Sequence, residues 1–214
     1  SVDTATGEIL ESKVIRGVSY SDWEDVAKSP THLFIGDFGN NISGKRTNMK
    51  IHRVKWEDIE NPDLDTIDAR SISFRFNSAY YPESDAAKND TKFDCEAMMV
   101  MNDTIYIFTK NWRDQDCYVY AIPNKANYTY TTLYPIDTIQ LEYMVTGADY
   151  DYATNSVALC GYTYDDGTIP TSNPYITIFY GFTGHDFQSG QVETKEYTSP
   201  TSIIFQSTGI TYNQ

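Results

Sequence analysis

Acidic side chains open two segments of the sequence in the same order. Asp22, Glu24 and Asp25 lie in "SDWEDV", and Asp94 and Glu96 lie in "FDCEAM". Carboxylates that are brought together can bind one cation, because Ca²⁺ takes about 6–8 oxygen ligands from carboxylates, amides and backbone carbonyls. Glu24 and Glu96 are the predicted calcium ligands. The alternative is that these acids cap turns and accept hydrogen bonds from nearby backbone N–H groups.

The overall charge limits the partners of the protein. The 214 residues carry a formal net charge of −14. Nucleic acids and anionic membranes are therefore not expected partners, because binding to phosphates needs clustered Lys and Arg. Cations, neutral ligands and basic partners fit this charge. No apolar stretch approaches the ~20 residues of a transmembrane helix, so we expect no membrane-spanning segment.

Other residue types with catalytic potential lack the spacing that catalysis needs. His32, His52 and His185 are scattered, and we expect each to be structural. No G-x-S-x-G elbow and no phosphate-binding loop occurs, so the sequence does not support a serine esterase or a nucleotide-binding protein. Cys95 and Cys160 lie within apolar runs, where we expect buried free thiols.

Four segments of the sequence repeat one order of features. Each begins with an acidic or glycine-led strand and passes through a short polar turn into an apolar strand such as "LFIG", "IYIF" or "VALCG". A polar loop and an alternating strand such as "KIHRV" or "YVYAI" follow, which is the pattern of antiparallel hairpins. These segments span residues 22–54, 94–123, 146–182 and, in part, 207–214. A further strand closes each of the first three, at residues 70–76, 131–141 and 194–199.

The repeat predicts an all-β fold, a β-propeller of four-stranded antiparallel blades in a single domain over residues 1–214. The predicted blades span approximately residues 22–76, 94–141 and 146–199, with partial blade strands at 8–19 and 205–214. A propeller closes with about four blades or more. The sequence therefore represents either a segment of a longer, six-bladed propeller or a ring whose first and last strands share one blade. The alternative fold is a β-sandwich with regular hairpins.

Propeller geometry also predicts a binding rim. The loop that enters the innermost strand and the loop between the second and third strands open on the same face of a blade. The predicted rim residues are Asp22, Asp37, Asn40, Asn41, Asp94, Lys110, Asn111, Trp112, Asp149, Tyr162 and Tyr164. In the repeat, the equivalent positions at the strand heads are Glu24, Glu96, Ala148 and Ile210. From the alternation of strand side chains, Glu24 is expected to share a face with Val26, and Trp23 to face the other way.

Two short motifs resemble known propeller families. "LFIGDFGNN" followed by "MKIHRV" resembles the NHL-repeat pattern, and "DWEDV" resembles the acidic strand heads of six-bladed propellers in the calcium-dependent paraoxonase-like group. The sequence also looks like the periplasmic SdiA-regulated and esterase-like phytase propellers. The third and fourth strand heads depart from this pattern, since they read "TGADY" and "STGITY". The resemblance implies a six-bladed propeller, a calcium ion, and a protein that is secreted, periplasmic or associated with the cell envelope.

Two functions follow from these observations. The preferred one is a secreted or periplasmic binding module that recognises a protein, a glycan or a small molecule at its acidic, aromatic rim. The alternative is a calcium-dependent hydrolase of the lactonase, esterase or phosphoesterase type. A metal-supported hydrolase needs a base beside an open coordination position. No histidine accompanies the acids, so we place the binding module first.

Overall fold

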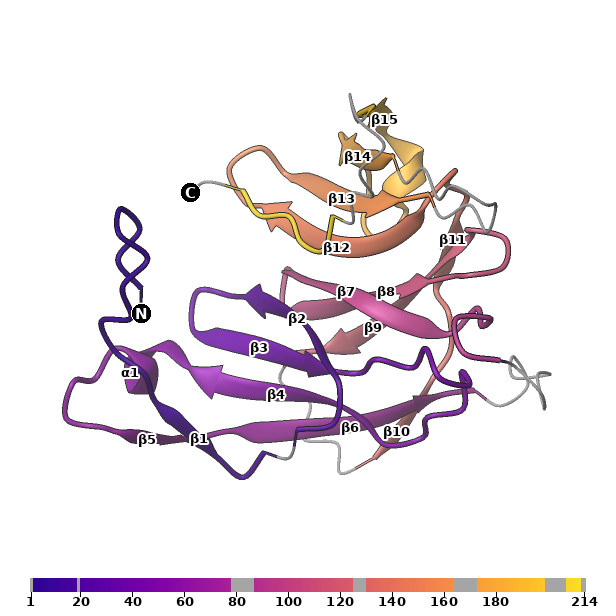
Figure 1. Ribbon diagram of the computed structural model, residues 1–214. Helices are drawn as coiled ribbons and strands as arrows, with labels where there is room; N and C mark the ends of the chain where they lie inside the picture. The colour runs from indigo at the N-terminus through magenta and orange to yellow at the C-terminus, as the bar shows by residue number, and fades with distance from the viewer. Residues whose placement is uncertain are drawn as a thin grey trace.

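The computed structural model describes residues 2–18, 20–77, 87–124, 130–163, 173–198 and 207–212. Figure 1 shows that these residues form three large β-sheets and one small one. The described helices are a single turn of α-helix, α1 (Trp56–Ile59), and a single turn of 3₁₀-helix, η2 (Phe187–Ser189). The all-β class predicted from the sequence is confirmed.

Each large sheet is made mainly of consecutive antiparallel hairpins. The first sheet contains β2 (Trp23–Lys28), β3 (His32–Asp37), β4 (Met49–Lys55), β6 (Arg70–Phe76) and β10 (Thr131–Leu133). The second contains β7 (Asp94–Met101), β8 (Thr104–Lys110), β9 (Cys117–Pro123) and β11 (Asp137–Ile139). The third contains β12 (Met144–Asp151), β13 (Ser156–Tyr162), β14 (Pro174–Tyr180) and β15 (Gln191–Glu196). The small sheet pairs β1 (Val14–Arg16) with β5 (Thr66–Asp68) in parallel.

The hairpin turns follow from their residue types. Asn102 and Asp103 link β7 to β8 with φ angles of 48° and 64°. A two-residue loop with positive φ at both positions matches the twist of an antiparallel pair, and Asn and Asp tolerate this conformation better than most residues. The sequence "MNDT" therefore specifies a tight reversal between two apolar strands.

Two segments pair differently from the sequence prediction. Residues 131–141 do not form one closing strand: β10 pairs in parallel with β6 of the first sheet, and only β11 pairs with β9 of the second. Pro135 lies between β10 and β11, and proline has no N–H to continue a ladder. Within residues 8–18, β1 pairs with β5 in a separate two-stranded sheet, and Ile15 of β1 packs against the apolar cluster of Ile35, Val54 and Ile67.

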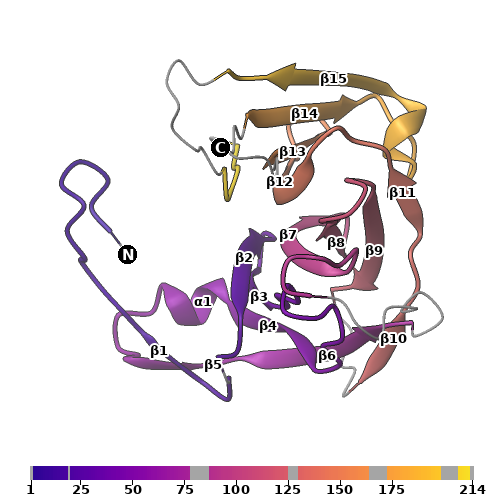
Figure 2. The ribbon, with the colours of Figure 1, turned by 45° about the vertical axis from the view of Figure 1, so that its right-hand side comes forward.

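The first strands of the three large sheets lie side by side. β7 packs between β2 and β12, and Figure 2 shows the three sheets fanning outward from these strands. Residues 207–212 continue the series beyond β12. Tyr212 N donates to Asp149 Oδ2 at 2.8 Å, and a Cβ added to Gly147 would lie 2.8 Å from the Cα of Gly209.

The packing of β7 on both faces explains why its sequence is almost entirely apolar. Met98 and Val100 pack into the layer shared with the first sheet, whereas Ala97, Met99 and Met101 pack into the layer shared with the third. Successive side chains of a strand point to opposite faces. A strand that is covered on both faces therefore needs an uninterrupted apolar run, and "AMMVM" supplies it.

Two smaller expectations concern the cysteines and membrane-spanning segments. Cys95, Cys117 and Cys160 are all free and buried, which confirms the prediction for Cys95 and Cys160. In the described part of the chain, we find no helix with the length and apolar character that crossing a bilayer requires.

Replacing Phe34 with alanine tests the packing between the first and second sheets. Phe34 is fully buried in their shared layer, so Phe34→Ala should lower the free energy of unfolding by about 3–5 kcal/mol. Urea denaturation measures this loss. The control Ile42→Ala changes a side chain that is 72% exposed and should stay within about 0.5 kcal/mol. Equal losses for the two variants would contradict the packing.

Candidate functional site

The first strand of each large sheet carries the same irregularity. A β-bulge lies between Trp23 and Asp25 in β2, between Cys95 and Ala97 in β7, and between Val145 and Gly147 in β12. The extra residues are Glu24, Glu96 and Thr146. A bulge interrupts the ladder and re-aims a side chain, and bulges are common beside functional sites. The two glutamates therefore occupy the same special position in their sheets.

The bulges correct the alignment of the strand heads. Ala148 pairs with Leu159, two positions beyond the bulge of β12, so Thr146 matches the two glutamates and Ala148 does not. "TGAD" at residue 146 matches "TGIT" at residue 208, so Thr208 takes this place in the last segment rather than Ile210. The equivalent position is thus a glutamate in β2 and β7 and a threonine in β12 and in the last segment.

The bulge in β2 also corrects the predicted alternation. Trp23 and Val26 pair with Asp37 and Ile35, which lie two positions apart on β3 and share a face. The extra residue Glu24 shifts the alternation by one position. Trp23 therefore lies on the same face as Val26 and not on the opposite one.

Four carboxylates come together at the heads of β2 and β7. A methyl group added to Gly39 would lie 2.3 Å from Asp22 Oδ2 and 2.4 Å from Glu24 Oε1, so the two carboxylates converge where glycine leaves room. Asp94 and Glu96 of the second sheet are close enough to act electrostatically on Glu24. We call Asp22, Glu24, Asp94 and Glu96 the acidic cluster.

Lys110 places an ammonium group beside the acidic cluster. Its Nζ donates to Glu96 Oε1 at 2.7 Å. The same nitrogen lies 4.3 Å from the centre of the Trp112 ring and 5.0 Å from that of Tyr162, where the ring faces attract a cation. Lys110 is only 4% exposed. The Lys110–Glu96 pair is therefore largely removed from water.

Asp94 links this group to the loop after β3. Its Oδ2 accepts a hydrogen bond from Trp112 Nε1 at 2.8 Å, and its Oδ1 accepts one from the backbone N–H of Asn40, also at 2.8 Å. Its carboxylate is thus engaged within the protein. Asp94 positions Trp112, which in turn lies against Lys110.

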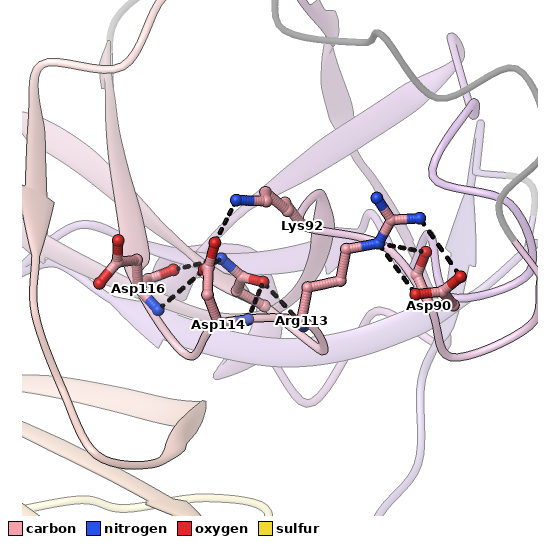
Figure 3. Close-up of polar contacts among 6 residues, drawn as sticks. Asp90, Lys92, Arg113, Asp114 and Asp116 are labelled. Carbon is pink, nitrogen blue, oxygen red and sulfur yellow. Dashed lines mark hydrogen bonds and ion pairs between the residues drawn. The ribbon is translucent and has the colours of Figure 1, made fainter.

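Ion pairs hold the turn that follows Lys110, as Figure 3 shows. Arg113 Nε donates to Asp90 Oδ1 at 2.9 Å, and Lys92 pairs with Asp114. Both pairs tie the turn after β8 to the segment that precedes β7. These pairs therefore fix the open end of the β7–β8 hairpin, where Lys110 lies.

Several predicted rim residues are buried and tie loops to strands. Asp37 accepts from Arg46 at 2.6 Å, Asn40 Nδ2 donates to the backbone oxygen of Phe93 at 2.8 Å, and Asn111 bonds within the turn that follows it. The side chains of Asp37, Asn40 and Asn111 are at most 4% exposed. They position the rim and are not accessible to a ligand.

The remaining predicted rim residues have different placements. Asn41 is half-buried at the turn after β3. Asp149 Oδ2 accepts the backbone N–H of Tyr212 and belongs to the neighbouring strand contact. Tyr162 is buried against the ammonium group described above. Tyr164 lies outside the described residues.

Burial dominates the electrostatics of the acidic cluster. Burial, followed by the charges of Glu96 and Asp22, raises the pKa of Glu24 to about 8. Burial also raises the pKa of Glu96, against the opposing charge of Lys110. Burial alone would lower the pKa of Lys110, but Glu96 and Tyr162 together outweigh it and raise that pKa. At neutral pH Glu24 is therefore mostly protonated, while Lys110 stays charged.

Asp25 joins β2 directly to β7. Its Oδ2 accepts the backbone N–H of Met98 at 2.7 Å, and its Oδ1 accepts that of Val26 at 2.8 Å. Burial raises the pKa of Asp25 to about 7, although both hydrogen bonds lower it. Asp149 and Tyr212 repeat this contact between β12 and the last segment.

The contacts of the acidic cluster test the predicted calcium site. Within the described ranges, no group of three or more His, Cys, Asp or Glu side chains is arranged to hold a metal ion. Glu96, one of the two predicted ligands, already bonds to Lys110. The residues present fit an ammonium group better than Ca²⁺, and we derive no chemistry through a metal.

An open cleft of about 620 Å³ runs beside the acidic cluster. One wall consists of all six residues of β2 with Leu33 and Ile35 of β3, and the other of Ala148, Asp149 and residues 208–211. Trp56 of α1 also lines it. Glu24 belongs both to the cleft and to the acidic cluster, so the two features form one candidate site.

Sequence reasoning missed three parts of this site. It did not identify the bond from Met98 to Asp25, the wall formed by Trp56, or the pairing of Lys110 with Glu96. One signal was available for the last of these. In the β7–β8 ladder Lys110 lies directly opposite Asp94, so an acid and a base face each other at the open end of a hairpin whose turn is recognisable in the sequence.

Comparison with known proteins does not extend this description. No protein-family model matches the sequence, and no match was found among curated proteins.

Glu24→Gln should weaken the dependence of stability on pH. The pKa of Glu24 is about 8 in the folded protein and about 4.3 in an unfolded chain. The folded state therefore binds this proton more tightly, and its contribution lowers the free energy of unfolding as the pH rises from about 4 to about 8. Glutamine cannot ionise, so this decline should disappear.

Urea unfolding at several pH values between 5 and 9 measures the effect of Glu24→Gln. The difference between variant and wild type should grow in favour of the variant as the pH rises. Glu8→Gln, at an exposed site, is the matched control and should follow the wild type. A constant difference between Glu24→Gln and wild type across this range would contradict the assignment.

Lys110→Met should destabilise the protein strongly. Removing one partner of a buried ion pair leaves the other charge without compensation and costs about 3–5 kcal/mol. The double variant Lys110→Met/Glu96→Gln should recover part of this loss. Lys55→Met removes an exposed partner of Glu57 and should cost about 0–1 kcal/mol. Chemical denaturation of the wild type and the three variants measures these losses of unfolding free energy. Similar losses for Lys110→Met and Lys55→Met would refute a buried pair.

Proposed function

We propose that this protein is a secreted or periplasmic binding module of the β-propeller type, and that it binds a ligand carrying a positive charge. Three observations support a propeller: the hairpin-built sheets, the fan-like arrangement around β2, β7 and β12, and the extended segment 207–212 that continues the series. The location outside the cytoplasm rests on the family resemblance of the strand motifs alone.

The observation that carries the binding proposal is the open cleft that reaches the acidic cluster. Its volume of about 620 Å³ lies within the range of about 300–1,000 Å³ that is usual for ligand sites. Trp23, Val26 and Trp56 give it an apolar and aromatic surface, and Glu24 and Asp25 place carboxyl groups on the same wall. Such a site combines apolar contact with a few polar groups that orient a ligand.

The electrostatics favour a ligand with a positive charge. Lys110 neutralises only part of the acidic cluster, and its bond goes to Glu96 rather than to Glu24. Burial, followed by repulsion from Glu96 and Asp22, raises the pKa of Glu24 to about 8, and a cation nearby would offset that repulsion and lower the pKa. Binding should therefore release a proton from Glu24, and affinity should increase as the pH rises through about 8.

Thermal unfolding with a small panel of ligands tests this function. Lysine amide and arginine amide should raise the melting temperature of the wild type, and more so at pH 9 than at pH 7. A ligand at one hundred times its dissociation constant stabilises the folded state by about 2.7 kcal/mol. Maltose is the neutral control, and calcium chloride tests the calcium-dependent alternative.

Glu24→Gln is the matched variant in this experiment. It should remove the effect of both amides at either pH. The proposal fails if neither amide shifts the wild type, or if the shift is the same in Glu24→Gln. A shift with calcium alone that depends on Glu24 would favour the hydrolase alternative instead.

A further inference from the structure

One wall of the cleft includes a strand edge as well as side-chain surfaces. All six consecutive residues of β2 line it, and so do the four consecutive residues 208–211. Successive side chains of a strand point to opposite faces. Since side chains of both faces of β2 line the cleft, the cleft reaches the backbone edge of β2, in addition to the face that β2 shares with Leu33 and Ile35 of β3.

The edge of β2 that borders the cleft lacks a strand partner in the described structure. β2 is the last strand of its sheet and pairs with β3 on one side only. Proteins commonly protect such edges, because an open edge can pair with another extended chain. β2 contains no proline and a single lysine, Lys28, and of its backbone groups the N–H of Val26 is bonded to Asp25 Oδ1.

The exposure of this wall differs from that of the equivalent positions in the other two sheets. Val26, Met98 and Ala148 follow the three bulges at the same distance and pair with the corresponding residues of the next strand. Met98 is 0% exposed and Ala148 is 5% exposed, whereas Val26 is 60% exposed. An apolar residue that is covered in the second and third sheets is thus left open in the first.

The charges along the cleft select the sign of an occupant. Glu24, Asp25 and Asp149 contribute carboxyl groups to its lining, and Lys28 contributes one ammonium group. A peptide with basic side chains complements this lining. Its apolar side chains would meet Trp23, whose ring lies on the same face as Val26.

We propose that the cleft binds an extended peptide with alternating apolar and basic residues, which pairs with the open edge of β2 as an added strand. This inference rests on the proposed binding function and names the class of ligand. In strand addition the backbone hydrogen bonds supply affinity, while alternate side chains supply specificity. The length of β2 sets the footprint at about six residues.

Calorimetry with three capped hexapeptides tests the proposal. The peptide VKVKVK should bind, and VEVEVE should not. VKPKVK carries the same charge but lacks one backbone N–H and the freedom to extend, so it should bind at least tenfold more weakly. Equal affinity of VKVKVK and VKPKVK would overturn the strand pairing, because charge alone would then explain binding.

Two variants place the peptide in the cleft. Val26→Arg adds a positive charge to the wall and should weaken VKVKVK at least tenfold. Val192→Arg makes the same change at a 45% exposed valine of β15 and should leave affinity unchanged. Unaltered binding by Val26→Arg would overturn the assignment to this cleft.

The two proposals fail in different ways. If the small amides bind in a manner that depends on Glu24 but VKVKVK does not bind, the binding function stands and the peptide inference is wrong. If neither the amides nor VKVKVK bind, both proposals are wrong. Circular dichroism of each variant confirms that a lost signal does not come from unfolding.

Discussion

A β-bulge at one repeated position is the constraint on which the site depends. In β2 and β7 the extra residue is a glutamate, and it interrupts the alternation that would otherwise send side chains in turn to the two faces of the sheet. The strand can then continue as a packed apolar element while its head carries carboxyl groups. If Glu24 were instead an ordinary residue of a regular ladder, Trp23 and Val26 would lie on opposite faces, and the apolar wall of the cleft would be divided.

The acidic cluster is held together by one internal ammonium group. Lys110 is bonded to Glu96 and enclosed by the rings of Trp112 and Tyr162, so its charge acts where little water screens it. Burial still raises the pKa of Glu96, which shows that the desolvation of the carboxyl group outweighs the attraction. A buried pair of this kind contributes little to stability. Burial and the charge of Glu96 raise the pKa of Glu24 while Lys110 lowers it, so the charge of a nearby ligand can change the protonation of Glu24.

Neighbouring first strands do not share a hydrogen-bonded ladder, so they depend on other contacts. Apolar layers fill the space between sheets. Hydrogen bonds to single carboxylates fix the position of each strand along its neighbour. Asp25 accepts from Met98 between β2 and β7, and Asp149 accepts from Tyr212 between β12 and the last segment. Burial raises the pKa of Asp25 to about 7, so this junction and the cleft beside it respond to the same range of pH.

Local patterns in the sequence determined the all-β class, the hairpin order and the bounds of some strands. "RSISFRF" is β6 residue for residue, and "MNDT" makes the expected turn, because alternation and turn chemistry act between near neighbours. The tertiary structure alone decided the bulges, the return of β10 to the first sheet, and the burial of Asp37, Asn40 and Asn111. It also decided that Lys110 pairs with Glu96. These features depend on which backbone groups and charges meet across sheets, and a register shift of one residue changes them without changing the local pattern.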